Sequence, residues 1–370
     1  MKILMIGWGF PPKIQGGLDI HVYEISRELA KRAEVLLALP EFNSPKRDSE
    51  GIKIIPVRCP KASAGSLVKT VSWYGKNAAE ACRNLDFDVI HSHDWFGVEA
   101  AEILKQKTGK PWVFTLHSLE FMRSCEQGGK SIMERQERRG AEKCDKVLTV
   151  SRLMRKEIAE RYGGKAEKID VVYNSAKEQE GEPGKIRKKL GLGERPVALF
   201  LGRLSNQKGP EYFLRSAKIV LDKIPEARFL VAGEGHMREG LEKFSKHMGL
   251  EGKVAFTGFV PESDLASYYA AADVFALPSL HEPFGITALE SLLAGTPVIV
   301  SEGAGALERL PEMDCVYKIR PGDSGDLAEK MVSGLSRRRR VSEREREAVK
   351  KAYSWERSAA EIFELYQKMI

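Results

Sequence analysis

The chain has 370 residues, of which 42% are hydrophobic and 30% charged, and its formal net charge is +7. This length exceeds the size at which one hydrophobic core keeps growing, so two domains are expected. The charge favours anionic partners but is too small to indicate nucleic-acid binding, and no zinc-finger spacing or basic zipper accompanies it. Five widely spaced cysteines indicate neither a disulfide framework nor a zinc site and fit a cytoplasmic protein. No apolar run reaches the roughly 20 residues that cross a bilayer, so any membrane contact would be weak and peripheral.

Apolar runs alternate with amphipathic helical patterns along the first half of the chain. Helices are expected at 20–32 and 98–107, between apolar runs that are too short for helices. The expected strands are 3–6, 35–39, 52–57, 89–92, 113–116, 147–150 and 169–172. This alternation predicts parallel strands joined by crossover helices.

A polar segment with Pro and Gly, 177–184, interrupts this pattern and predicts an interdomain linker. A second series of strands follows, at 197–202, 229–232, 254–257, 274–277 and 298–300. The expected fold class is therefore α/β, with two doubly wound, Rossmann-like domains at 1–176 and 196–354 and a linker at 177–195. A ligand is expected to bind in the cleft that faces the carboxyl ends of both sheets.

Two acids, Glu282 and Glu290, bracket an expected turn from a strand to a helix. Pro283 suits the first position of that helix, and the free amides at a helix start suit a phosphate. These amides are expected to be those of Phe284, Gly285 and Ile286. The acids would then bind sugar hydroxyls, because a carboxylate can accept two hydrogen bonds from a diol. A glycosidase pair is the rival, but it needs carboxyl groups about 5 to 9.5 Å apart, whereas eight residues of helix rise about 12 Å.

Two cations, Arg203 and Lys208, follow the expected strand 197–202 and precede a helix that begins near Pro210. Fixed cations at the carboxyl end of a strand suit a diphosphate. Alone, such residues are more often solvated than functional. The phosphate-binding turn about eighty residues later, in the same series of strands and helices, favours the functional interpretation.

Together these residues resemble the family 4 retaining glycosyltransferases, which have the two-domain GT-B fold. The resemblance runs nearly end to end, and the run 9–18 with His93-Asp94-Trp95 is closest to the glycogen-synthase-like branch. The motifs that carry it are Gly16-Gly17, His91-Ser92-His93-Asp94-Trp95, Thr115-Leu116-His117-Ser118, Val150-Ser151, Gly202-Arg203-Leu204, Lys208-Gly209, Gly233-Glu234-Gly235, Pro278-Ser279, the segment from Glu282 to Glu290, and Tyr353-Ser354-Trp355-Glu356.

The resemblance implies a metal-independent hexosyltransferase without a cofactor. It would move a hexose, with glucose expected, from a nucleotide sugar to a hydroxyl of a carbohydrate or lipid-linked acceptor. The identities of the nucleotide, the sugar and the acceptor stay open. The alternatives include an α-glucan synthase and a mannosyl or glucosyl transferase acting on a lipid-linked or phosphorylated acceptor. Three functions compete with transfer, namely those of a GT-B epimerase or phosphorylase, a glycan-binding protein and a dinucleotide oxidoreductase. The helix 355–370 is expected to return to the first domain.

The resemblance also assigns roles to residues. The catalytic residues are expected to be His117, Glu282, Arg203 and Lys208. The donor-binding residues are expected to be Gly16, Gly17, Arg203, Lys208, Phe259, Glu282, Phe284, Gly285, Ile286 and Glu290. Within this set Glu282 would bind the transferred sugar and Glu290 the ribose diol, while His93 and Asp94 would lie on the acceptor side.

Three further segments carry weaker expectations. Asp86-Phe87-Asp88 spells the metal signature of another glycosyltransferase fold, but it precedes the strand 89–92, at the end away from the expected cleft. His91 and His93 share one face of that strand without a third ligand nearby, so no metal site is expected. The run 337–340 contains four arginines and is expected to be a solvated helix start. The segment 172–177 departs from the Asn-Gly-Val-Asp of the family, which leaves any role of Asn174 open.

Overall fold

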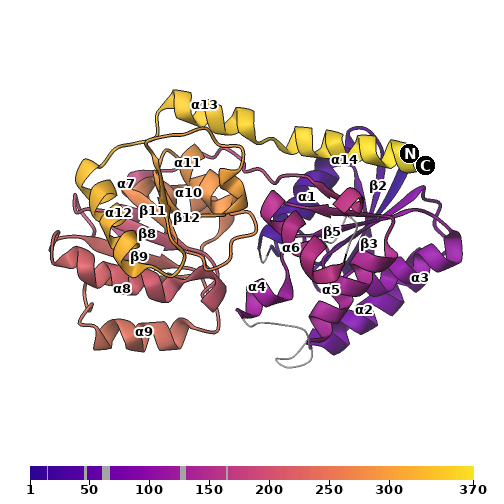
Figure 1. The fold of residues 1–370 in the computed structure, drawn as a ribbon, viewed down its shortest axis with the longest axis horizontal. Helices are drawn as coiled ribbons and strands as arrows, with labels where there is room; N and C mark the ends of the chain where they lie inside the picture. The colour runs from indigo at the N-terminus through magenta and orange to yellow at the C-terminus, as the bar shows by residue number, and fades with distance from the viewer. Residues whose placement is uncertain (15, 46–47, 61–66, 126–130, 164–165) are drawn as a thin grey trace. The chain divides into compact units, whose positions relative to one another are not determined.

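Figure 1 shows a computed structural model of the chain, which describes residues 1–14, 16–45, 48–60, 67–125, 131–163 and 166–370. The chain forms two compact units. Unit 1 comprises Met1–Phe121, Glu126–Asn174 and Ser354–Ile370, and unit 2 comprises Met122–Cys125 and Ser175–Tyr353. Each unit contains one parallel sheet with helices on its faces, so the predicted α/β class with two Rossmann-like halves is confirmed.

The sheet of unit 1 has seven parallel strands in the order β3-β2-β1-β4-β5-β6-β7. Its central strands are buried on both faces, which explains why they read as continuous apolar runs. The strands are β1 (Lys2–Ile6), β2 (Glu34–Pro40), β3 (Ile52–Val57), β4 (Val89–His93), β5 (Trp112–Leu116), β6 (Lys146–Thr149) and β7 (Ile169–Val171).

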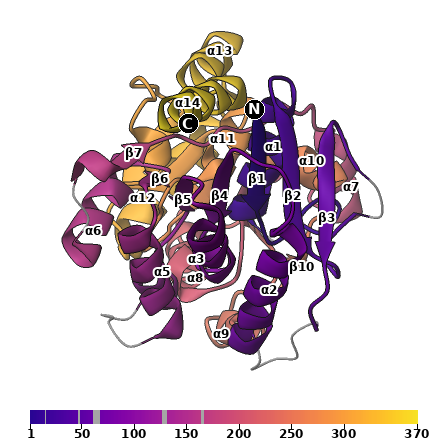
Figure 2. The same ribbon diagram turned by 90° about the vertical axis from the view of Figure 1, so that its right-hand side faces the viewer.

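The helices of unit 1 form two groups. Helix α1 packs against α14, and α3 packs against both α2 and α5; Figure 2 shows these two groups in unit 1. The helices are α1 (Gly17–Ala30), α2 (Leu67–Cys82), α3 (Val98–Thr108), α5 (Ile132–Lys143), α6 (Arg152–Tyr162) and α14 (Trp355–Met369), with the short η1 (Ala166–Lys168). The short helix α4 (Glu120–Ser124) is divided between the units, since its residues from Met122 onward belong to unit 2. In α14, Ile362 and Tyr366 are fully buried, and their spacing of four places them on one helix face.

The sheet of unit 2 has six parallel strands in the order β10-β9-β8-β11-β12-β13. The strands are β8 (Val197–Leu201), β9 (Arg228–Ala232), β10 (Val254–Gly258), β11 (Val274–Leu277), β12 (Val298–Ser301) and β13 (Val316–Ile319). Strand β13 was not predicted from the sequence. It lies at the edge of the sheet and only Ile319 among its residues is buried, so its apolar signal is weak.

The helices of unit 2 also form two groups. Helix α8 packs against α9 and α12, whereas α11 packs against α10 and α13. The helices are α7 (Pro183–Lys189), α8 (Pro210–Leu221), α9 (Arg238–His247), α10 (Glu262–Ala271), α11 (Ile286–Leu293), α12 (Ser324–Arg337) and α13 (Glu343–Ala352), with the short helices η2 (Asn206–Lys208) and η3 (Gly305–Leu307).

The segment predicted as a linker, 177–195, is not irregular throughout. Helix α7 begins within it at Pro183, a residue that suits the first turn of a helix. Its Ile186 is fully buried, and Lys185 forms an ion pair of 2.6 Å with Asp264 of α10. The polar composition hid this helix because a single apolar residue anchors it.

The arginine run 337–340 is not a solvated helix start. Arg338 ends α12 in a left-handed conformation and pairs with the buried Asp273 at 3.1 Å. Arg339 pairs with Glu345, and Arg340 donates to the carbonyl of Ala272 at 2.8 Å. The run therefore fastens the end of α12 inside unit 2. A capping box formed by Ser342 and Glu345 opens the next helix, α13.

Each sheet has one point at which the order of its strands reverses. This point lies between β1 and β4 in unit 1 and between β8 and β11 in unit 2. Open α/β sheets bind ligands beyond the carboxyl ends of the strands at such points. No helix in the described parts of the chain is long and apolar enough to cross a membrane.

Candidate functional site

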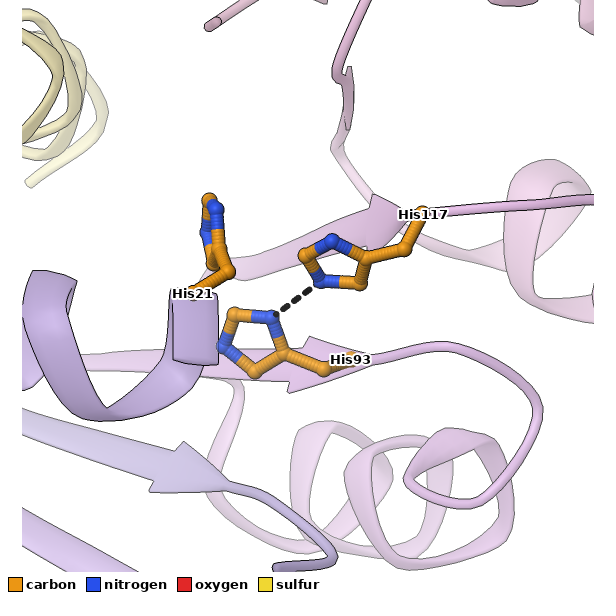
Figure 3. Close-up of side chains that lie close together, drawn as sticks. All are labelled: His21, His93 and His117. Atoms are coloured by element: carbon orange, nitrogen blue, oxygen red, sulfur yellow. Dashed lines mark hydrogen bonds between the residues drawn. The ribbon is translucent and has the colours of Figure 1, made fainter. Parts of the chain in front are cut away.

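Three histidines of unit 1 lie together beyond the carboxyl ends of β4 and β5 (Figure 3). The parallel register pairs His93, the last residue of β4, with Thr115, so the chain after β5 brings His117 beside His93. His21 comes from α1. The three side chains are buried, and one ring nitrogen of each lies within 4.8 Å of the other two.

The hydrogen bonds of this cluster leave part of each ring unpaired. His21 Nδ1 bonds Asn174 Oδ1 at 2.7 Å, and His93 Nδ1 bonds His117 Nε2 at 3.2 Å. The second nitrogen of each ring is buried and has no hydrogen-bond partner among the described residues. These atoms are His21 Nε2, His93 Nε2 and His117 Nδ1.

Burial keeps these rings neutral. It lowers the pKa of His21 to about 4 and holds the pKa values of His93 and His117 well below the usual value, because an imidazolium loses its hydration there. Neighbouring histidines lower the pKa of His93 and His117 further, whereas the bond to Asn174 opposes the shift at His21.

His91 lies next to this cluster but differs from its three members. It lies on the same strand and is fully buried, but it bonds Tyr366 Oη through Nδ1 and Thr115 Oγ1 through Nε2. Both of its ring nitrogens are thus engaged, and it links α14 to the sheet. The expectation that no third ligand lies near His91 and His93 is wrong, because His21 and His117 complete a cluster around His93.

Asp94 fixes the loop that carries His117. Its backbone is in the left-handed region, with φ of 45°, a conformation that few residues other than glycine adopt. Its carboxylate Oδ1 accepts a hydrogen bond from the backbone N–H of His117 at 2.7 Å. Asp94 therefore positions His117. Gly16 and Gly17 lie at the start of α1, with Gly16 as the N-cap residue.

Asp86 and Asp88 lie before β4, at its amino end. Asp86 pairs with Lys2 Nζ at 2.7 Å, and Asp88 accepts the backbone N–H of Lys2, also at 2.7 Å. Both carboxylates therefore fasten β1 to the start of β4.

In unit 2, Lys208 and Glu282 form an ion pair in the loops after β8 and β11. Lys208 Nζ lies 2.8 and 3.1 Å from the two oxygens of Glu282, and the buried Ser279 donates to one of them at 2.7 Å. Glu282 is almost completely buried, whereas Lys208 is partly exposed. A buried carboxylate with two donors is held in one orientation, and the lysine keeps a face open to a ligand.

The two loops approach closely because of Gly209. A Cβ atom at this position would lie 2.2 Å from the carbonyl oxygen of Pro278, and the φ of 67° suits glycine. Gln207 also donates to the carbonyl of His281 at 3.2 Å. These contacts fix the loop that carries Lys208 against the loop that carries Glu282.

The position of Pro283 relative to α11 differs from the prediction, although the predicted start of the helix at Ile286 is confirmed. The helix begins at Ile286, and Gly285 is its N-cap residue with φ of 97°. Pro283 therefore lies outside the helix, because the left-handed glycine interrupts the helical conformation. The backbone amide of Phe284 precedes the helix. The side chain of Phe284 is buried, and its ring packs edge-on against the ring of Tyr353. The amides that open the helix belong to Gly285, Ile286 and Thr287.

Glu290 lies on α11 and faces α10. Tyr269 donates to its carboxylate at 2.9 Å. Burial raises the pKa of Glu290 to about 7, and the bond from Tyr269 opposes this shift. Of the other predicted residues, Arg203 and Phe259 are exposed, and 67% of the surface of Phe259 is accessible.

The structure thus brings together two sets of predicted residues, His93, Asp94 and His117 in unit 1 and Lys208 and Glu282 in unit 2. Sequence reasoning missed His21, Ser279 as a donor, and Tyr269. None of the three carried a distinctive local signal, since the buried positions of α1 include Asp19, Glu24 and Glu28 beside His21.

Comparisons with known proteins agree on one family. Residues 15–178 match the model of Glycosyltransferase Family 4, and residues 184–355 match that of Glycosyl transferases group 1. An uncharacterized glycosyltransferase of Methanocaldococcus jannaschii is 31% identical, over 99% of this chain and 98% of the relative. A glycogen synthase of Mycobacterium tuberculosis is 27% identical, over 99% of this chain and 94% of the relative. The solved structure of Anabaena HepE in complex with UDP-glucose has a TM-score of 0.78 and 21% identity, with both chains covered in full.

Proposed function

Because the chain belongs to the family 4 glycosyltransferases and has their GT-B fold, we propose that it transfers a hexose from a nucleoside-diphosphate sugar to a hydroxyl acceptor, with retention of anomeric configuration and without a metal. Glucose is the proposed hexose. The donor proposal is supported by the UDP-glucose named in the complex of Anabaena HepE, and the glycogen-synthase relative supports a carbohydrate acceptor.

The observation that carries this proposal is the Lys208–Glu282 pair at the switch point of unit 2. Lys208 and Arg203, from the loop after β8, would bind the diphosphate and stabilise the charge that develops as it leaves. Glu282 would accept hydrogen bonds from hydroxyls of the transferred sugar. Its fixed orientation, set by Lys208 and Ser279, suits the recognition of one stereochemistry.

The remaining predicted residues take supporting roles in this proposal. The amides of Gly285 and Ile286 open α11 and would bind phosphate oxygens. Glu290 would bind the ribose diol, and Phe259 would contact the base. In unit 1, Gly16 and Gly17 would contact the diphosphate, His117 would face the sugar, and His93 and Asp94 would border the acceptor.

The proposed reaction needs no protein nucleophile. The bond between the anomeric carbon and the phosphate oxygen breaks, and the electron pair goes to the departing diphosphate. The acceptor oxygen then bonds the anomeric carbon from the same face, and its proton passes to the departing phosphate oxygen. Lys208 and Arg203 supply the positive charge that this departure requires.

A panel of UDP-, ADP- and GDP-sugars, labelled in the sugar, tests this proposal. Each donor is incubated with the chelated protein, first in water and then with glucan, sugar-phosphate and lipid-linked acceptors. Label transferred to an acceptor with the donor's anomeric configuration supports it. Inversion of the anomeric configuration overturns the proposed retention, and turnover that returns only after magnesium or manganese is added overturns the proposed metal independence. Turnover without an acceptor favours an epimerase or phosphorylase.

Binding of the free nucleoside diphosphate separates the roles of the two acids. Glu290→Gln should weaken this binding, because the ribose is part of the product. Glu282→Gln should lower the turnover rate at nearly unchanged affinity for the diphosphate, because that product lacks the sugar. Equal losses of diphosphate affinity in calorimetric titrations of both variants would show that the division of roles is wrong.

A further inference from the structure

The histidine cluster of unit 1 contains more lone pairs than its contacts use. His21, His93 and His117 are each at least nine-tenths buried, and each has one ring nitrogen without a hydrogen-bond partner among the described residues. A buried polar atom without a partner is destabilising, so such atoms are usually satisfied by water, an ion or a ligand. Three such rings lie in one cluster, with one nitrogen of each within 4.8 Å of the others, so the cluster can offer lone pairs to a common ligand.

We propose that His21, His93 and His117 form a binding site for one divalent transition-metal ion of the zinc type. One nitrogen of each ring already lies within 4.8 Å of the others (Figure 3). The nearest pair of nitrogens, His93 Nδ1 and His117 Nε2, is 3.2 Å apart. These two atoms share a hydrogen bond, which an ion bound between them would replace, and His93 Nε2 and His117 Nδ1 would then face away from the ion. Two imidazole nitrogens on a tetrahedral zinc ion, each about 2.0 to 2.1 Å from the metal, lie about 3.3 Å apart. The nitrogen of His21 would have to approach to this distance from within 4.8 Å.

The chemistry of the ligand set selects the class of metal. Three imidazoles suit zinc, cobalt, nickel and copper, whereas magnesium and calcium prefer oxygen ligands. One of the two bonded nitrogens, His93 Nδ1 or His117 Nε2, carries the proton of their hydrogen bond, and binding an ion there would move that proton to the other nitrogen of the same ring. The carboxylate of Asp94, bonded to the backbone of His117, supplies negative charge beside the cluster.

The partner of His21 is typical of a metal ligand. Asn174 Oδ1 can only accept, so His21 Nδ1 carries the proton and Nε2 keeps its lone pair. Ligating histidines commonly donate their other ring nitrogen to such an oxygen, which fixes the tautomer and the ring. This assigns a role to Asn174, the residue in the segment that departs from the family sequence.

His91 shows that burial alone does not create this arrangement. It is as buried as the three ligands and lies on the same strand, but Tyr366 and Thr115 occupy both of its nitrogens. His91 is therefore a matched control. The exposed His236 and His247 of unit 2 are the controls for binding at the surface.

One consequence rests on the proposed function. If His117 faces the transferred sugar, an ion that holds its ring competes with the donor, and zinc should inhibit transfer. The metal would then be an inhibitor or regulator and not a cofactor of the reaction.

Metal binding is measured directly on the chelator-treated, full-length protein. Calorimetric titration with Zn²⁺ should show one ion per chain, and Co²⁺ should give the visible absorption of a tetrahedral nitrogen site. His21→Gln and His93→Gln should each weaken zinc binding at least tenfold. Asn174→Ala should weaken it about 10- to 100-fold with all three ligands intact. Zinc, and not magnesium, should raise the melting temperature of the wild type.

The controls decide between this site and nonspecific binding. His91→Gln and the double variant His236→Ala, His247→Ala should keep the wild-type zinc affinity. The inference is overturned if His21→Gln binds zinc as tightly as the wild type, if the surface variant loses the binding, or if the wild type gives no cobalt spectrum. The cobalt spectrum and the zinc-induced shift come from the wild type, so a variant that fails to fold does not hide the result.

Transfer is assayed separately with and without zinc. Zinc binding without any transferase activity would refute the proposed function and leave the metal site standing. Transfer by a protein that binds no zinc would refute the metal site alone.

Discussion

The histidine cluster of unit 1 and the charged pair of unit 2 occupy equivalent places, beyond the strands at which each sheet reverses its order. They use opposite electrostatics. The cluster consists of buried neutral rings with unused lone pairs, whereas Lys208 and Glu282 carry opposite charges that satisfy each other. The same fold therefore builds one site from uncharged ring nitrogens and another from paired charges.

The largest effect is expected from the cations of unit 2. Lys208→Ala and Arg203→Ala should each slow transfer about 10²-fold or more, because one preorganised charge partner is worth roughly 2.7 to 4 kcal/mol in comparable sites. Arg215→Ala is the matched control, since Arg215 forms an exposed pair with Glu211 on α8. Steady-state rates measure the effect. Wild-type turnover in Lys208→Ala would remove the basis of the charged site.

The same pair should also matter for stability. Lys208→Ala leaves the buried carboxylate of Glu282 with Ser279 as its remaining donor, so the free energy of unfolding should fall by about 2 kcal/mol. Adding Glu282→Gln removes the uncompensated charge and should recover most of this loss. Urea unfolding of the two single variants and the double variant checks this. Additive losses would show that the two side chains do not stabilise each other.

In unit 1, Tyr366→Phe should create one more unpaired histidine nitrogen. His91 loses the partner of its Nδ1, and the free energy of unfolding should fall by about 1 to 2 kcal/mol. Tyr23→Phe is the control, because Tyr23 bonds the exposed Glu50 and should lose less. Equal losses of free energy of unfolding in the two variants would show that the buried hydrogen bond of His91 stabilises the protein no more than the exposed one of Tyr23.

The carboxyl of Glu290 should make stability depend on pH. Its pKa is about 7 in the folded protein and near 4.5 when unfolded, so the folded state holds the proton more tightly. The stability that this group contributes is present below pH 4.5 and is lost as the pH rises to 7. The free energy of unfolding of Glu290→Gln, measured relative to that of the wild type, should therefore rise by on the order of 1 kcal/mol as the pH goes from 5 to 8. A constant difference in urea unfolding at the two pH values would contradict this.

The smallest effect is expected at Asp86. It is exposed and pairs with Lys2 at the amino end of β4, away from both sites. Asp86→Asn should leave transfer unchanged, both in the presence and in the absence of a chelator. If transfer is lost with a chelator and also in Asp86→Asn, the Asp86-Phe87-Asp88 segment would instead be a metal-binding site needed for activity.

The sequence predicted most strands because parallel strands buried on both faces read as apolar runs, as at β1 and β11. The loop after β8 was also predictable, because Arg203 and Lys208 follow such a run closely. The placement of Pro283 at the first position of α11 was wrong, since Pro283 favours a helix locally but the left-handed conformation of Gly285 keeps it outside the helix. His21 was missed because 72 positions of chain separate it from His93, and no local pattern records which helix crosses a strand end.

The last helix has a consequence for the order in which the protein is made. Helix α14 belongs to unit 1, although 179 residues of unit 2, Ser175–Tyr353, precede it in the chain. It places Trp355 against His21, with ring centroids 5.8 Å apart, and Tyr366 against His91. During synthesis the surface of α1 that α14 covers stays open until α14 itself leaves the ribosome. A stop codon near Ser354 would therefore spare the carboxyl-terminal unit and leave the amino-terminal one unfinished.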